Sequence, residues 1–574
     1  MLKINQENGV IKGERRADKA LLFVLIMHNS NLANKLIAKY GVPSVLLLII
    51  FMGIFLRTYH FADWMKFGEE QARDAKIARN VVENHGSLPL LGPKAGDTKF
   101  KVGPAYYYFQ SLSANVFGMT PDKLAYPDLF FSILTIPLLL FFLKKYFSNI
   151  ISILLTALYA VSVVAVQNSR FAWNPNSIDF FVVLFLFSFL NAIEAEKQTA
   201  KVYWAMLTGI ALGVGLQLHT TFLLIVPLVF LLNAAYVIKK KRGLSLELVL
   251  MVLGIIVFLN IPQIISEYQT GGENTRAFIE GILAPPQGER TWVGGFLSDA
   301  SWQAQASAMF MTPFGNESIS DYASAIGERN RRIDEVVSRE PLVAVRWRLM
   351  LEILLTLAGY WALIRFLKKE TDEKKKNFLS LTGLYITVSL LVLFPVAHDL
   401  ILVLRYLFIE QFVPFVLLGL LAEIAIEKFG KIGMGISVLF VVILMSLNVF
   451  WLKKDFESFA NNTHQASDET LGEETFVGKF IKERTRPSQQ AYLVDEGKSM
   501  EHFIVPLGYF IDGKRIELLT GGQSSGAENP AFFSLQLVGS GRADSLSDGL
   551  LQNYSITEGA TYGRLEIFAL EPRR

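Results

Sequence analysis

The sequence predicts an α-helical polytopic membrane protein with a small α/β domain at its C-terminal end. Hydrophobic residues make up 52% of the 574 residues, and the mean hydropathy is +0.36. Apolar runs long enough to cross roughly 30 Å of hydrocarbon recur about eleven times before residue 453. After that position the sequence turns mixed and polar, and short alternations at 491–494 and 565–569 flank a helical pattern near 473–483.

The predicted membrane part covers residues 43–452. Its spans are expected at 43–59, 124–143, 149–166, 178–194, 202–218, 220–238, 246–266, 347–366, 378–396, 401–424 and 432–452. The run at 106–117 is about a dozen residues long, and counting it as a span would reverse the side of every later loop. We therefore expect it to be a juxtamembrane or re-entrant helix. The run at 21–27 is also too short to span, and no small-residue cleavage site of a signal peptide follows it.

Basic residues are sorted by connection, which predicts the orientation in the membrane. Residues 1–42 and alternate later connections are rich in lysine and arginine, notably Lys144-Lys145, Lys197 with Lys201, Lys239-Lys240-Lys241-Arg242, Arg365 to Lys376, and Lys428 with Lys431. By the positive-inside rule, the 1–42 segment is cytoplasmic. The loops 60–123 and 267–346 and the tail 453–574 are then extracytoplasmic, in a multi-pass protein of the cell membrane.

Composition excludes some chemistry. The chain contains no cysteine, which rules out disulfides and thiolate metal sites. The net charge of +3 says little, because the charges are distributed by loop. We expect membrane lipids among the partners and no nucleic acid.

The polar segment 67–79 follows the first predicted span and is the strongest candidate for a functional site. If it is helical, Glu70, Arg73, Asp74 and Ile77 share one face. A carboxylate can take a proton from an acceptor hydroxyl, and a guanidinium can hold a departing phosphate. The alternative is a solvated helix face with weak pairs between side chains one turn apart.

The same loop continues with many turn signals, including His85-Gly86-Ser87-Leu88-Pro89 and Ala95-Gly96-Asp97. Long unstructured insertions of this size are usually functional or disordered. Because this loop has helix-compatible ends and apolar anchors, we expect an ordered lid on the membrane.

Several motifs occur in order along the chain. The first outer loop contains Gly68-Glu69-Glu70-Gln71-Ala72-Arg73-Asp74-Ala75, then Leu90-Leu91-Gly92-Pro93 and Gly103-Pro104-Ala105-Tyr106-Tyr107-Tyr108; residues 169–176, 216–220 and Arg405-Tyr406 follow. Together they resemble the integral-membrane glycosyltransferases of the C fold superfamily (GT-C), especially bacterial relatives of the protein O-mannosyltransferases and of the aminoarabinose transferases that modify lipid A (family 39-like). The resemblance covers residues 43 to about 450 and leaves the tail uncovered.

Two positions depart from the pattern of these families. Glu70 stands where they usually have aspartate, so either Glu70 or Asp74 could be the catalytic carboxylate. Val102 stands where they have a basic residue before the proline step, and Lys101 precedes it.

The resemblance implies an inverting transfer of a sugar from a polyprenyl-phosphate donor to a lipid, glycan or protein acceptor. Glu70 or Asp74 would act as the general base. The donor phosphate would be bound by Arg73, Lys101, Arg170 and Arg405, and the substrates would be contacted by Tyr106, Tyr107, His219 and Tyr406. No cofactor is required, although a carboxylate pair could bind a divalent metal. The sequence identifies neither the sugar nor the acceptor, and it leaves open the role of the tail and the oligomeric state.

Other interpretations stay open for single residues. Arg170 could snorkel to the membrane interface beside Trp173, His219 could be a helix-end histidine, and the tyrosines 106–108 could form an interfacial belt. His398-Asp399 is weak evidence for a metal or proton site.

For the whole chain, the main rival is a transporter or lipid flippase. Such a protein would need ionisable residues near mid-span or matched broken helices. Most of the predicted spans are uninterrupted, and their charges gather at the outer ends.

Overall fold

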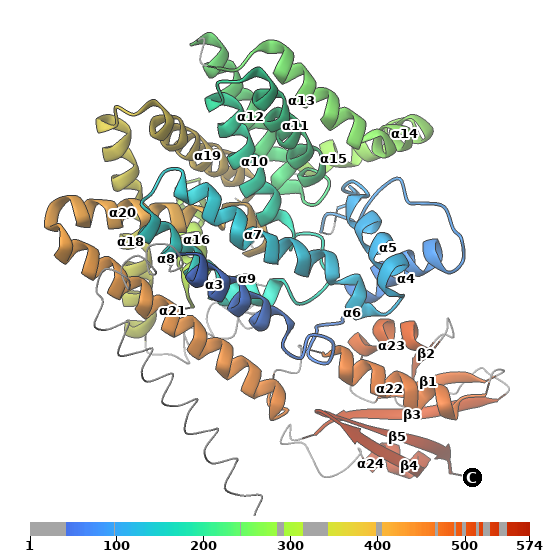
Figure 1. Ribbon diagram of the computed structural model, residues 1–574. Helices are drawn as coiled ribbons and strands as arrows, with labels where there is room; N and C mark the ends of the chain where they lie inside the picture. The colour runs from blue at the N-terminus through green and yellow to red at the C-terminus, as the bar shows by residue number, and fades with distance from the viewer. Residues whose placement is uncertain are drawn as a thin grey trace, which may run out of the picture.

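The computed structural model is a helical membrane part with a small α/β domain at one end (Figure 1). It describes residues 42–573 apart from 97, 241–242, 284–291, 314–341, 398–403, 465–468, 487–488, 496–500, 512–515, 520–528 and 539–547. Most of the 1–42 segment, much of the 267–346 loop and His398-Asp399 therefore lie outside the described residues.

Each predicted span coincides with one helix or with two consecutive helices. They are α3 (Val42–Thr58), α7 (Tyr126–Lys144), α8 (Asn149–Val161) with α9 (Val163–Asn168), α10 (Ile178–Glu194), α11 (Gln198–Gly215), α12 (Thr220–Lys239), α13 (Leu246–Leu259) with α14 (Ile261–Thr270), α18 (Leu342–Lys369), α19 (Glu373–Ala397), the 3-10 helix η2 (Leu404–Glu410) with α20 (Val413–Phe429), and α21 (Lys431–Ala460). Two further helices, α15 (Glu273–Leu283) and α16 (Trp292–Met311), lie in the 267–346 loop.

Length and composition support a polytopic membrane protein. Within the described residues, 5 helices are long and apolar enough to cross a membrane, or up to 7 if each bent pair forms one span. The remaining predicted spans are shorter or broken. Ser162 ends α8 and caps α9, and Asn260 separates α13 from α14, which bend by 60° ahead of Pro262.

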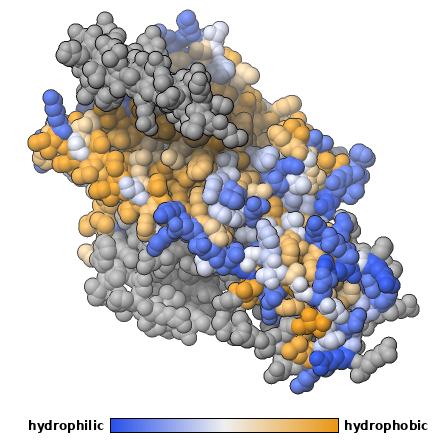
Figure 2. Space-filling view, turned by 60° about the horizontal axis from the view of Figure 1, so that its bottom comes forward, coloured by the Kyte–Doolittle hydropathy of each residue, from blue (hydrophilic) through white to orange (hydrophobic). Residues whose placement is uncertain are grey.

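The surface of the helical part has the character expected of a lipid-facing wall. Large apolar side chains such as Phe51, Phe258 and Leu439 are more than half exposed. Figure 2 shows hydrophobic surface gathered over the helical part and mostly hydrophilic surface toward the opposite end. Lipid replaces water around such side chains, so their exposure has no cost in a bilayer.

The first outer loop forms three helices, α4 (Glu69–Val82), α5 (Ala105–Phe117) and α6 (Pro121–Leu124). The segment that contains Glu70 and Asp74 is therefore helical, and the 106–117 run is a short helix, as predicted. Two motif glycines allow close contacts within the connection from α4 to α5 and between this connection and Gln217, which follows α11. A Cβ on Gly92 would lie 2.1 Å from the Gly103 carbonyl oxygen, and one on Gly103 would lie 2.4 Å from Gln217 Cγ. Only glycine fits these two positions without displacing the loop.

The predicted α/β domain is present in the tail. It comprises α22 (Leu471–Arg484), β1 (Gln490–Val494), the short 3-10 helix η3 (Glu501–Phe503), α23 (Ile504–Phe510), β2 (Ile516–Leu519), β3 (Pro530–Leu537), α24 (Asp548–Asn553), β4 (Tyr554–Tyr562) and β5 (Leu565–Pro572). The sheet has the order β2-β1-β3-β5-β4; β1 pairs in parallel with β2 and β3, and the remaining pairs are antiparallel. The helix α21 runs past the expected boundary at 453, because the polar residues that follow Leu452 continue it to Ala460.

The C-terminal domain is fixed to the first outer loop. The Phe67 amide donates to the Glu469 carbonyl oxygen at 3.2 Å, and the Leu471 amide donates to that of Met65 at 2.7 Å. The Arg79 guanidinium of α4 lies 3.8 Å from the ring centre of Tyr509 in α23. The tail and the first loop therefore lie on the same side of the helical part.

Basic connections that were predicted to be cytoplasmic also meet one another. Lys145 after α7 pairs with Glu194 at the end of α10 at 2.7 Å. Lys375 in α19 pairs with Glu423 of α20 at 2.6 Å, and Arg365 of α18 pairs with Glu427 at 2.8 Å. Each pair joins segments that the lysine pattern placed on the same side.

We expect Arg564→Met to destabilise the C-terminal domain by about 3 kcal/mol, because the change leaves the buried Glu473 carboxylate without its charged partner. The Arg564 amide and guanidinium donate to Glu473 at 2.9, 3.2 and 3.0 Å, and both side chains are at most 4% exposed. Hydrogen exchange of β5 in the full chain measures the loss. Lys479→Met, which removes a charge from an exposed part of α22, is the matched control. Equal protection of β5 in both variants would contradict the prediction.

The same pair predicts a pH dependence. Burial alone would raise the pKa of Glu473, but the hydrogen bonds from His464 and Arg564 lower it to about 2. The folded-state pKa is below the ordinary 4.5, so this stabilisation is complete above that pH and is lost as the pH falls toward 2.

Candidate active site

A cavity of about 470 Å³ lies where the first outer loop, the short loop after α9, η2, the end of α21 and the C-terminal domain meet. Its polar lining combines acids and bases from all five segments: Lys66, Glu69, Glu70, Gln71, Gln167, Asn168, Arg170, Arg405, Asp455, Glu469, Thr470 and His502. Its aromatic lining consists of Trp64, Phe171, Trp173, Phe408 and Phe459. A concave site with mixed apolar walls and a few convergent charges is the usual form of a substrate pocket.

Trp173 contacts one of the two candidate carboxylates and one of the four candidate cations. Its indole N–H donates to Glu70 Oε2 at 2.8 Å. The Arg405 guanidinium lies 5.8 Å from the centre of its ring and 5.4 Å from that of Tyr406. Among the described residues, the contacts of the Arg405 guanidinium are these two aromatic rings, and no ion pair is formed. A base and a cation therefore share one cavity.

The position of Trp173 is fixed by its own loop. The Trp173 amide donates to Asp128 Oδ2 at 3.1 Å, and the Ser177 hydroxyl donates to Asp128 Oδ1 at 2.5 Å. The Asn174 side-chain amide donates to the Leu218 carbonyl oxygen at 2.5 Å, which ties this loop to the start of α12. The indole is thus oriented before any substrate arrives.

Asp74 lies behind the cavity and not in its lining. It is 1% exposed, and its Oδ1 accepts hydrogen bonds from Arg73 Nε at 2.9 Å and from the Tyr107 hydroxyl at 3.0 Å. Burial raises the pKa of Asp74 to about 6, although both hydrogen bonds oppose that rise. The helix α4 thus turns Glu70 toward the cavity and Asp74 toward α5.

Arg170 borders the cavity, but its donors face the end of α3. Its guanidinium donates to the carbonyl oxygens of Leu56, Arg57, Tyr59 and His60, at 3.1, 3.2, 2.7 and 3.4 Å. A helix end leaves its last carbonyl groups without helical partners, and a cation satisfies them well. In this arrangement Arg170 connects the two outer loops.

The other predicted site residues lie around this centre. His219 caps α12 through Thr221, and its ring lies 5.7 Å from that of Tyr406. Burial and the nearby charge of Arg405 lower the pKa of His219 to about 3, so the ring is neutral. The Lys101 backbone is bonded to the Asn274 side chain at 2.8 and 3.0 Å, while its own side chain is exposed.

Tyr106 and Tyr107 are each 3% exposed. The Tyr106 hydroxyl accepts from Gln110 at 3.0 Å, and neither tyrosine lines the cavity.

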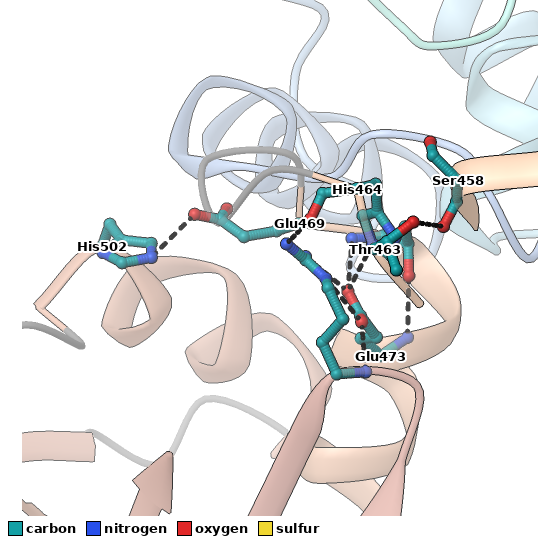
Figure 3. Close-up of polar contacts among 8 residues, drawn as sticks. Ser458, Thr463, His464, Glu469, Glu473 and His502 are labelled. Atoms are coloured by element: carbon teal, nitrogen blue, oxygen red, sulfur yellow. Dashed lines mark hydrogen bonds and ion pairs between the residues drawn. The ribbon is translucent and has the colours of Figure 1, made fainter. Parts of the chain in front are cut away.

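Sequence reasoning missed the residues that the tail and the Trp64–Lys66 turn contribute. His502 Nε2 lies 3.1 Å from Glu469 Oε1, and the two side chains point toward one another in Figure 3. The tail has no recognisable motif, so nothing in the sequence marked these two residues. Lys66 could have been found, since a lysine close before Glu69-Glu70 adds a cation to the same segment.

Within the described ranges, no group of three or more histidine, cysteine, aspartate or glutamate side chains is arranged to hold a metal ion.

Comparisons with known proteins bear on this fold. Residues 101–264 match the family described as dolichyl-phosphate-mannose-protein mannosyltransferase. No curated protein sequence matches the chain. Among solved structures, the chain is similar to ArnT from Cupriavidus metallidurans bound to undecaprenyl phosphate, with 10% identity, a TM-score of 0.51, and coverage of 92% of this chain and 97% of that one.

A second similar structure is the apo oligosaccharyltransferase of Archaeoglobus fulgidus, with 13% identity, a TM-score of 0.46, and coverage of 87% of this chain and 70% of that one. The ArnT likeness establishes the fold, and the family match covers the segment from Lys101 to α14. The predicted resemblance is thereby confirmed: this chain has the fold of the integral-membrane glycosyltransferases of the C superfamily, and its residues 101–264 match their mannosyltransferase family.

Proposed function

We propose that the protein transfers a sugar from a polyprenyl-phosphate donor to an envelope acceptor, with inversion at the anomeric carbon. The observation that supports this best is the pairing of Glu70 and Arg405 through Trp173 in one cavity. A group that accepts a proton and a group that holds a phosphate are the two parts that this reaction needs.

The donor phosphate binds at Arg405, with Lys66 as the second cation of the cavity. Arg405 is available because its described contacts are aromatic rings, which leave its N–H groups free to form a bidentate contact with phosphate oxygens. The undecaprenyl phosphate named for the ArnT structure is a ligand of this class. Positive charge at this point stabilises the leaving phosphate as its charge develops.

Glu70 is the base in this scheme. The acceptor hydroxyl oxygen forms a bond to the anomeric carbon, the carbon–oxygen bond to the phosphate breaks, and the hydroxyl proton passes to Glu70. The polyprenyl phosphate leaves with the bonding electron pair. The indole N–H of Trp173 orients the carboxylate, so its rotamer is set before the acceptor binds.

Asp74 and Arg73 support this centre from behind. The ionised Asp74 holds Arg73 and the Tyr107 hydroxyl, and this contact joins α4 to α5. Tyr107 acts here as a positioning residue. The function of Asp74 is to keep Glu70 at the cavity edge.

The rival interpretation, a transporter, requires ionisable residues inside the helical part that line a path for the substrate or for ions. Arg57, Asp179 and Glu410 are buried there, but each is hydrogen-bonded to a neighbour: Arg57 to Ser132 at 2.9 Å, Asp179 to Tyr159 at 2.5 Å, and Glu410 to Gln303 at 2.6 Å. None of the three lines the cavity of the candidate active site. Such hydrogen bonds between helices fit interhelical packing better than a transport path.

We expect Glu70→Gln to reduce turnover by about 10²–10⁴-fold, because the amide cannot take the acceptor proton. Donor binding should change little, since the substitution keeps the size of the side chain. Release of polyprenyl phosphate by purified protein measures the rate. Glu83→Gln removes an exposed carboxylate just after α4 and serves as control. If Glu70→Gln is mild while Asp74→Asn abolishes transfer, Asp74 is the base instead.

The acidic limb of the pH–rate profile should lie near pH 6. The pKa of Asp74 is about 6, above its ordinary 3.8, so its proton binds as the pH falls through that value. The protonated carboxyl then holds Arg73 less firmly, and kcat/KM should drop. Asp74→Asn should lower the rate at pH 7.5 and abolish the limb. If the acidic limb is unchanged in Asp74→Asn, the limb reports the protonation of a group other than Asp74.

The site is proposed to face the extracytoplasmic side, and single-cysteine labelling tests this. The chain has no cysteine, so each variant carries one reactive thiol. Cysteines at positions 95, 300 and 479 should react with an impermeant reagent from outside, and those at 240 and 372 only after lysis. Labelling of 479 exclusively from the cytoplasm would show that the predicted number of spans is wrong by an odd number.

A further inference from the structure

A second cavity of about 440 Å³ adjoins the candidate active site. It lies between the end of α3, the end of α21 and the first turn of the C-terminal domain. Trp64, Phe459 and Thr470 line both cavities and form the wall between them. A molecule bound in the second cavity would therefore lie next to the one that contains Glu70.

One wall of this cavity is a stack of flat rings. The His60 and Trp64 rings lie 4.3 Å apart at 13°, and the Trp64 and Phe459 rings lie 5.7 Å apart at 18°. Such faces carry partial negative charge and attract the weakly positive C–H groups of a sugar ring. A hydrocarbon chain needs no such flat, partly polar surface.

Polar groups surround the stack. Asp63, whose side chain is 60% exposed, lies 3.6 Å from His60 Nδ1. His464 is 4% exposed, and its Nδ1 has no hydrogen-bond partner within the described residues. Figure 3 shows His464 close to Glu473 and to the end of α21 marked by Ser458. Rings flanked by a carboxylate and an imidazole provide both stacking and hydrogen bonds for hydroxyl groups.

Two residues that line the cavity have left-handed backbone. His60 has φ 48° and Asn462 has φ 58°, and both residues line the cavity. The described chain contains one other non-glycine residue with positive φ, His85. A left-handed residue of this kind commonly follows a helix end, and here it ends α3 and α21 at the cavity.

We propose that this cavity is a saccharide subsite that holds a sugar ring of the acceptor beside the donor. The inference rests on the proposed function for its link to transfer, and it narrows the acceptor to a glycan or a glycolipid. The acceptor ring stacks on His60, whose side chain is 45% exposed and whose ring is supported by Trp64, and Asp63 and His464 bind its hydroxyl groups. The hydroxyl to be glycosylated then points past Trp64 toward Glu70.

The test measures saccharide binding apart from transfer. The full-length protein in nanodiscs is titrated calorimetrically with soluble oligosaccharides of hexoses, pentoses and N-acetylhexosamines. His60→Asn removes the ring while keeping a residue that tolerates positive φ. Asp63→Asn removes only the charge. His85→Asn is the matched control, because it makes the same change at the same kind of backbone position outside both cavities.

We expect at least one saccharide to bind the wild type, His85→Asn and Glu70→Gln alike. His60→Asn and Asp63→Asn should each weaken that binding at least tenfold and raise the acceptor KM, while donor hydrolysis by water continues. Asp63→Asn keeps the inference testable if His60→Asn folds poorly.

Two results would overturn the subsite: no saccharide bound by the wild type, or binding that neither variant weakens. In the first case, Glu70-dependent donor hydrolysis would leave the proposed function standing. Conversely, saccharide binding that depends on His60 and Asp63, without any donor hydrolysis or transfer, would support the subsite and refute the proposed function.

Discussion

The hydrogen bond from Trp173 to Glu70 is the contact on which the site depends. Glu70 is at the start of a loop helix, and Arg405 is in a 3-10 helix before α20. Among the described residues, no backbone hydrogen bond joins these two segments, and the Trp173 side chain contacts both. Trp173 does so because its amide is anchored on Asp128 while its ring reaches both groups. A rigid aromatic side chain is suited to this task, since only two torsions need to be fixed.

The C-terminal domain is part of the same construction. Its backbone pairs with Met65 and Phe67 on either side of Lys66, and the Tyr509 ring packs on Arg79. Through these contacts Glu469 and His502 reach the cavity, and Tyr562 reaches the adjoining one. The tail therefore completes one wall of each cavity. This gives the C-terminal domain a physical role, although its sequence has no recognisable motif.

Much of the architecture was predictable, because it depends on local patterns. Apolar runs predicted the helices of the eleven spans, and the alternations at 491–494 and 565–569 predicted β1 and β5, whereas α15 and α16 in the 267–346 loop were not predicted. Helix breaks were harder to foresee. Ser162 and Asn260 interrupt apolar runs. Their side chains form hydrogen bonds to other helices; the Asn260 side-chain amide, for example, donates to the Gly213 carbonyl oxygen at 3.1 Å. For this reason fewer helices than expected are long enough to span alone.

The sequence by itself determined that this is a polytopic helical membrane protein and that both Glu70 and Asp74 are candidates, which would share one face if the segment 67–79 is helical. These properties follow from hydropathy and from a 3.6-residue period. Tertiary structure decided which carboxylate faces the cavity and which is buried against Tyr107. It also brought Trp173 to Glu70 across 103 residues and the Tyr509 carbonyl to Arg79 across 430. Such long-range contacts depend on how whole elements pack, and no local pattern encodes them.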